Sequence, residues 1–110
     1  MWGLSENRLI YDEDVLWYLN NHEEVKNMLP KIIAKIFDKL GDVKLKLALD
    51  SENEKELDIY ISYIRFPHYN DNTLTKIGKV VEYCAGDILE VTKSDENLLI
   101  HITTDFVGYD

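Results

Sequence analysis

The densest group of side chains that could do chemistry lies in residues 65–71. Arg65, His68, Tyr69 and Asp71 bring a fixed positive charge, an imidazole, a phenol and a carboxylate into one short segment. The segment follows a predicted strand and precedes a predicted helix, whose first backbone N–H groups attract anions. Because an arginine side chain can donate two parallel hydrogen bonds to paired oxygens, these residues predict a site for an anionic ligand. The alternative is a connector in which Phe66 and Tyr69 cover the edge of the core, His68 faces water and Asp71 or Asn72 caps the helix.

The histidines do not predict a metal site. The chain has three, His22, His68 and His101, and none has a histidine or cysteine three or four residues away, as a local metal clamp requires. A metal ion would therefore need ligands from distant elements. His101 falls on the outer side of a predicted strand and His22 in the first turn of a predicted helix, as ordinary surface histidines do. We expect no metal and no cofactor.

Two other features favour structural roles. The acidic run Asp50–Glu54 resembles a calcium loop, but Lys55 stands where that loop needs glycine and Ile61 where it needs glutamate. The single cysteine, Cys84, falls on the apolar side of a predicted helix with no base at a recognisable spacing, which predicts an inert buried thiol. The sequence contains no glycine-rich phosphate loop, serine elbow or dinucleotide fingerprint. A catalytic activity is therefore not expected.

The elements that must position these groups begin with two helices. Apolar residues recur at steps of three and four over residues 22–40, the pattern of an amphipathic helix. Asn21 followed by Glu24 predicts a capping box at its start, and Gly41 predicts its end. A shorter helix is predicted over Val15–Leu19, because an acidic stretch precedes it and suits a helix N-terminus.

The rest of the chain predicts strands around a further helix. Apolar and polar residues alternate over Val43–Leu49 and Leu57–Ile64, which predicts an antiparallel hairpin, and over Leu98–Phe106, which predicts the last strand. Between them, Thr73–Ala85 predicts a helix that ends at the glycine that follows. The β-branched content of residues 88–91 favours a strand there over more helix.

These elements predict one α+β domain over residues 1–110. Their order is α-α-β-β-α-(β)-β, where the bracketed strand is residues 88–91. Such an order is best packed as a mostly antiparallel sheet of three to four strands with the helices on one face. A chain of 110 residues can bury one hydrophobic core and leaves little room for a second.

The second face of this sheet predicts a contact surface. By alternation it carries Tyr60, Ile64 and Leu99 among its polar residues, which suits a face that water covers only in part. We expect the N-terminal segment that contains Trp2, or a second copy of the chain, to cover it.

Composition limits the partners and the compartment. The 21 acidic and 12 basic residues give a net charge of −9, whose field repels phosphate backbones and anionic lipid heads. No apolar run approaches the ~20 residues that span a bilayer, and the first residues lack the pattern of a secretory signal. The single cysteine agrees with a reducing compartment. We therefore expect a cytoplasmic protein that binds neither nucleic acid nor membrane.

Part of the pattern resembles known sequences. The helix that contains Leu29-Pro30-Lys31 and ends at Leu40-Gly41, the strand Val43–Leu47 and the segment Glu56–Ile61 are similar to those of small uncharacterised prokaryotic α+β proteins. The resemblance implies a helix-hairpin-helix-strand layout and a cytoplasmic prokaryotic setting. It carries no activity and no site residue with it.

Three functional hypotheses follow. The acidic surface, the partly apolar sheet face and the lack of catalytic motifs favour a non-enzymatic protein–protein interaction module that binds a protein partner or forms a homodimer. A small anion-binding domain or enzyme that uses residues 65–71 is the first alternative. An acidic inhibitor of a basic nucleic-acid-binding protein is the second, and its affinity would fall steeply with salt.

Overall fold

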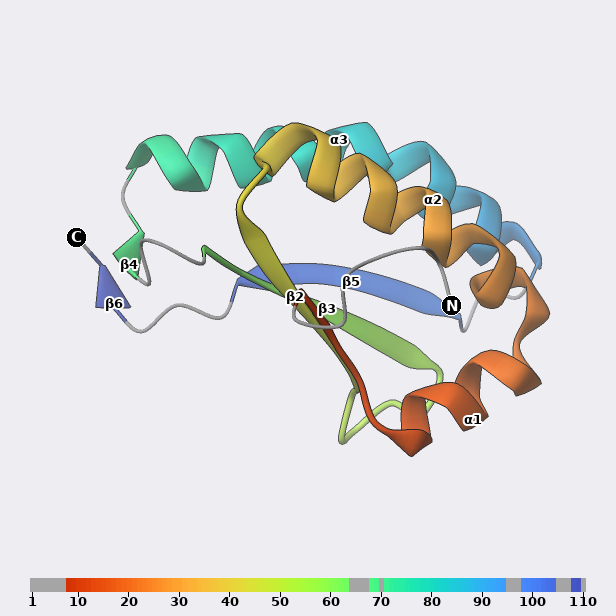
Figure 1. Ribbon diagram of the computed structural model, residues 1–110. Coiled ribbons are helices and arrows are strands. Elements are labelled where there is room, and N and C mark those ends of the chain that lie inside the picture. The colour runs from red at the N-terminus through yellow and green to blue at the C-terminus, as the bar shows by residue number, and fades with distance from the viewer. Residues whose placement is uncertain (1–7, 64–67, 70, 95–97, 105–107, 110) are drawn as a thin grey trace.

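The strands form a β-sheet, and helices pack against it (Figure 1). The computed structural model describes residues 8–63, 68–69, 71–94, 98–104 and 108–109. The elements are β1 (Leu9–Ile10), α1 (Glu13–Asn21), α2 (Glu23–Leu40), β2 (Val43–Leu49), β3 (Glu56–Tyr63), β4 (His68–Tyr69), α3 (Asp71–Ser94), β5 (Leu99–Thr104) and β6 (Gly108–Tyr109). Within these ranges, no helix is both long enough and apolar enough to cross a bilayer.

The main sheet has the strand order β1-β2-β3-β5. Strands β2 and β3 form the predicted antiparallel hairpin, with Val43 opposite Tyr63 and Leu49 opposite Leu57. The other two neighbouring pairs, β1 with β2 and β3 with β5, are parallel. A separate parallel pair joins β4 to β6. The α+β class is confirmed, but the prediction of a mostly antiparallel sheet is wrong, because the sheet is mixed with mostly parallel pairing.

The length of α3 explains the parallel pairing of β3 with β5. Residues 88–91 lie inside the helix, so the predicted strand there and the predicted helix end at Gly86 are both wrong. The apolar steps of three and four continue from the buried Cys84 to the partly buried Ile88 and to Val91, which is 1% exposed. Full burial of a valine side chain contributes about 1.5–3 kcal/mol. A glycine inside a helix costs only about 1 kcal/mol relative to alanine. Because a helix then connects β3 to β5, the second strand returns parallel to the first.

Strand β1 was not predicted. It has two residues, too few for a periodic pattern, and it lies parallel to β2 at the edge of the sheet. The backbone N–H of Leu45 donates to the carbonyl of Arg8 at 2.8 Å, and the Arg8 side chain donates to the carbonyls of Val43 and Gly41. These hydrogen bonds attach the start of the described chain to β2.

The helix ends follow the sequence in part. Asp12 caps α1 by accepting a hydrogen bond from the N–H of Val15, at 3.2 Å. The predicted capping box of α2 is wrong, because Asn21 still belongs to α1 and its side chain donates to the carbonyl of Trp17. The predicted end of α2 is confirmed: Gly41 has a φ of 72°, the left-handed region that glycine enters without strain.

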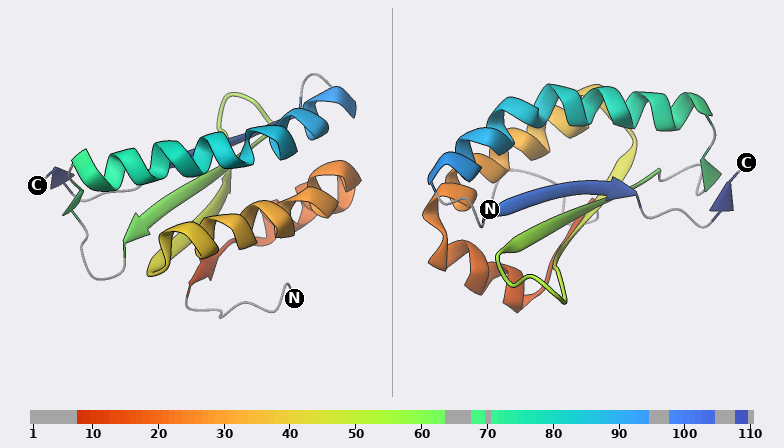
Figure 2. Two further views of the ribbon diagram at one scale, coloured as in Figure 1. Left: turned by 90° about the horizontal axis from the view of Figure 1, so that it is seen from above. Right: turned by 180° about the vertical axis from the view of Figure 1, so that it is seen from behind.

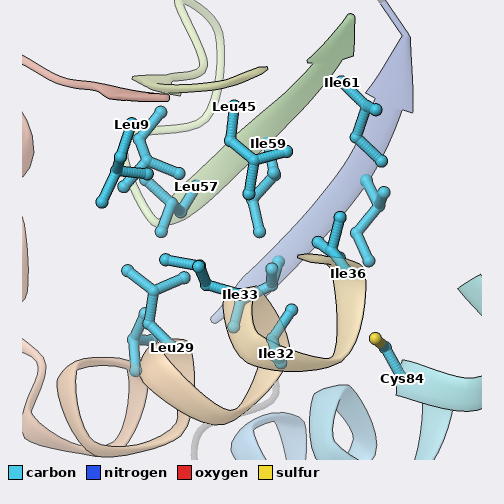
Figure 3. Close-up of a cluster of buried hydrophobic side chains, with 14 of the residues drawn as sticks. Leu9, Leu29, Ile32, Ile33, Ile36, Leu45, Leu57, Ile59, Ile61 and Cys84 are labelled. Carbon is cyan, nitrogen blue, oxygen red and sulfur yellow. The ribbon is translucent and has the colours of Figure 1, made fainter. Parts of the chain in front are cut away.

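Helices α2 and α3 lie side by side on one face of the sheet (Figures 1 and 2). Figure 3 shows Leu45, Leu57 and Ile59 of the strands directed toward Ile33 and other residues of α2. Helix α1 contributes to the same core, and the hydroxyl of the fully buried Tyr18 donates to the carbonyl of Lys55 at 2.8 Å. In β5, Ile100 and Ile102 are buried whereas Leu99 and His101 are exposed, which confirms the alternation predicted there.

Candidate functional site

The four residues of the predicted anion site are only partly placed. Arg65 lies outside the described residues, and for His68 and Tyr69 only the backbone is described, in β4. Asp71 is exposed as the first residue of α3, and its carbonyl accepts a hydrogen bond from the hydroxyl of Thr75. The grouping of these side chains around a ligand therefore stays a prediction.

The predicted contact surface is also placed in part. Tyr60 on β3 and Leu99 on β5 have registers that put them on the outer face of the sheet, opposite the helices, and Leu99 is exposed. Ile64 and Trp2 lie outside the described residues. What covers the outer face stays a prediction.

Two acidic residues and a histidine meet on this outer face. Glu56 and Asp58 are two residues apart on β3, so their side chains leave the same side of the strand. The parallel register places His101 of β5 opposite Asp58. A ligand atom from each of the three side chains lies within 4.8 Å of the other two. We call these three residues the outer-face cluster.

Asp58 is the buried member of the outer-face cluster. Its side chain is 6% exposed, whereas that of His101 is 57% exposed. The Oδ1 atom of Asp58 is buried and receives no hydrogen bond from the described part of the chain. The nearest cationic candidate, Nδ1 of His101, is 3.7 Å away, which is too far for a hydrogen bond. A buried carboxylate oxygen in this state lacks the positive partner that normally offsets its lost hydration.

The protonation of Glu56 reflects the same shortage of positive charge. A hydrogen bond with Asp58, then burial, then the negative charges of Asp58 and Asp50 together raise the pKa of Glu56 to about 7. Two neighbouring carboxylates without a cation repel each other, so one of them retains its proton. A bound cation would therefore neutralise the negative charge of the outer-face cluster.

Helix α1 presents a second distinct surface. Trp17 is 66% exposed, the highest value among the large apolar side chains of the described residues, and Leu16 next to it is 36% exposed. Residues 12–25 contain five carboxylates and no lysine or arginine. On the helix, Glu13 and Asp14 lie one turn before Trp17 and thus on the same side. We call this the acidic tryptophan surface.

A groove at the junction of α2 and α3 has the opposite charge. It has a volume of about 320 Å³ and is lined by Lys39, Lys76, Lys79, Val80 and Tyr83. The Nζ atom of Lys39 lies 4.9 Å from the ring centre of Tyr83. In a chain with a net charge of −9, three lysines around one groove form a local region that attracts anions. We call it the lysine groove.

Comparison of the chain with protein family models, with curated proteins and with solved structures finds no match. The resemblance to small prokaryotic proteins therefore stays a prediction. Function must therefore be inferred from the chemistry of the outer-face cluster, the acidic tryptophan surface and the lysine groove.

Sequence reasoning did not find the outer-face cluster. The alternation of apolar and polar residues places His101 correctly on the outer side of its strand, but it does not indicate which residues lie beside this histidine. The available signal was Asp58, a charged residue between the apolar Leu57 and Ile59 in a strand at the centre of the sheet. Pairing Asp58 with His101 requires the parallel register of β3 and β5. That register was not predicted, because α3 was expected to end at Gly86.

Proposed function

We propose that this protein is a non-enzymatic interaction module that binds a basic protein through the acidic tryptophan surface. The observation that carries the proposal is the 66% exposure of Trp17 on a helix whose Val15, Tyr18 and Leu19 are buried in the core. Tryptophan is enriched at binding hot spots, where replacing the residue by alanine costs about 2 kcal/mol or more of binding free energy. An indole that the described residues leave largely uncovered is suited to an apolar pocket on a partner.

The surrounding charge indicates the partner's chemistry. Glu13 and Asp14, one helical turn before Trp17, place negative charge beside the indole, and residues 12–25 carry five carboxylates in all. Cations on a partner would be attracted by this charge, which would accelerate and orient the partner's approach. An anionic lipid surface or a nucleic acid would be repelled by the same field. The partner that fits is a protein with an apolar pocket rimmed by lysine or arginine. A basic nucleic-acid-binding protein is one member of that class, so the inhibitor hypothesis is a special case of this proposal.

The test starts from proteins captured from a cell lysate by the wild-type chain and by Trp17→Ala. A captured protein supports the proposal only if, once purified, it binds wild type at least about tenfold more tightly than Trp17→Ala, equivalent to about 1.4 kcal/mol. Its affinity must also fall as sodium chloride is raised from low to physiological concentration, because screening weakens attraction between surface charges. Identical capture by the two proteins would contradict the proposal.

Leu89→Ala is the matched control. Leu89 is 60% exposed on α3, so this change also removes an exposed apolar side chain, but on a different surface. We expect the control to bind the partner like wild type. Equal losses in Trp17→Ala and Leu89→Ala would show a nonspecific apolar effect and would overturn the assignment to α1.

The lysine groove favours a second candidate function, the binding of a small anion. Its three lysines and the ring of Tyr83 suit a ligand that combines negative charge with a planar group. Thermal-shift titration with ATP and with inorganic phosphate, on wild type and on Lys76→Ala, tests it. The candidate requires stabilisation of wild type that Lys76→Ala loses. It is refuted if neither probe stabilises wild type.

A further inference from the structure

We propose that Glu56, Asp58 and His101 bind one divalent transition-metal ion of the zinc class on the outer face of the sheet. The proposal is independent of the acidic tryptophan surface. It begins from geometry: the three residues come from two adjacent strands, and their ligand atoms lie within 4.8 Å of one another. Ligands that share one ion at about 2.0–2.2 Å are separated by roughly 3–4 Å, so small side-chain movements suffice.

The buried carboxylate is the independent observation that indicates a ligand. Asp58 is 4% exposed, and its Oδ1 atom receives no hydrogen bond from the described residues. Directly opposite on β2 stands Ala48, which offers neither charge nor hydrogen bond. A metal ion bound between Asp58 and His101 would give this oxygen the positive partner that its burial requires.

The donor set selects the class of ion. Two carboxylates and one imidazole supply oxygen and nitrogen, a combination that suits zinc and neighbouring transition metals. Calcium takes six to eight oxygen ligands, and magnesium prefers oxygen ligands together with several waters. A site in which one of the three protein ligands is a histidine nitrogen is therefore poorly matched to either ion. His101 is 57% exposed, so an ion can enter from solvent and water can complete its coordination.

Rigidity also favours binding. The ligands lie on regular strands that pair over six residues, from Glu56 with Leu99 to Ile61 with Thr104. The inner face of β3 is fixed by fully buried Leu57, Ile59 and Ile61. Sites held on strands lose less conformational entropy when they bind an ion than sites formed by mobile loops.

The test is calorimetric titration of the untagged full chain, stripped of metal, with zinc chloride in a buffer that does not chelate zinc. We expect one zinc ion per chain and a rise in melting temperature. Calcium and magnesium chlorides should bind at least about tenfold more weakly. His101→Ala should weaken zinc binding at least about tenfold, and this exposed position leaves the fold intact. Asp58→Asn should weaken it similarly.

Two controls make the result specific. His22→Gln removes a histidine located between α1 and α2, and Glu52→Gln removes an exposed carboxylate from the β2–β3 connection. Both should bind zinc like wild type. The proposal is overturned if wild type binds no zinc, if His101→Ala and Asp58→Asn bind zinc like wild type, or if calcium binds as tightly as zinc.

Discussion

At Asp58 the outer face of β3 is nearly as buried as the inner face, but its chemistry is the opposite. On the inner face Leu57, Ile59 and Ile61 are fully buried against the helices. On the outer face Asp58, between two of them in sequence, is 4% exposed. Burying an apolar side chain stabilises the fold, whereas burying a carboxylate without a close positive charge opposes it. The inner face is therefore explained by folding alone, and the outer face requires a further explanation in function.

The largest expected effect comes from replacing two neighbouring residues on opposite faces of β3. Ile59→Ala should lower the free energy of unfolding by about 2–5 kcal/mol, since it removes buried methyl groups and leaves a cavity. Asp58→Asn, next to it, keeps the side-chain size and removes the charge, so it should not destabilise the metal-free chain at pH 8. Urea denaturation of the two variants measures both effects. A large loss in Asp58→Asn would mean that its carboxylate is stabilised by a partner and would remove the difference between the faces.

A smaller effect should appear in the pH dependence of stability. The pKa of Glu56 is raised from 4.5 to about 7 in the folded protein, so between these values the folded state binds more protons than the unfolded state. The contribution of this residue is therefore fully present below pH 4.5 and is lost as the pH rises through 7. Glu56→Gln, which has no proton to lose, should show a flatter stability profile over this range in thermal denaturation. A profile identical to that of wild type would contradict the raised pKa of Glu56.

The extent to which sequence predicted these features depends on how local each signal was. Periodicity located α2 and the β2–β3 hairpin, because both are set by contacts close in the chain. It failed at Gly86, where a local stop signal was outweighed by the burial of Val91 and the partial burial of Ile88. The parallel β3–β5 pair and the outer-face cluster were lost with that error, because both depend on where the chain returns after α3. The exposure of Trp17 was also not predicted, because a short amphipathic pattern does not show which of its aromatic residues lies outside the core.

The smallest expected effect comes from Leu99, on the outer face of the edge strand β5. Leu99 is 39% exposed, so Leu99→Ser should change the free energy of unfolding of a dilute sample by only about 0.5 kcal/mol. Ile100→Ala on the inner face of the same strand, where Ile100 is 2% exposed, is the control and should lose about 2–5 kcal/mol. If a second copy of the chain covers the outer face, as the sequence predicts, Leu99→Ser should become more destabilising as protein concentration rises, because association stabilises the wild-type chain by mass action. Thermal denaturation over a hundredfold range of concentration, with light scattering on the same samples, distinguishes the two cases. A loss in Leu99→Ser that is large at every concentration would mean that the chain itself buries this residue, and the outer face would then resemble the inner one.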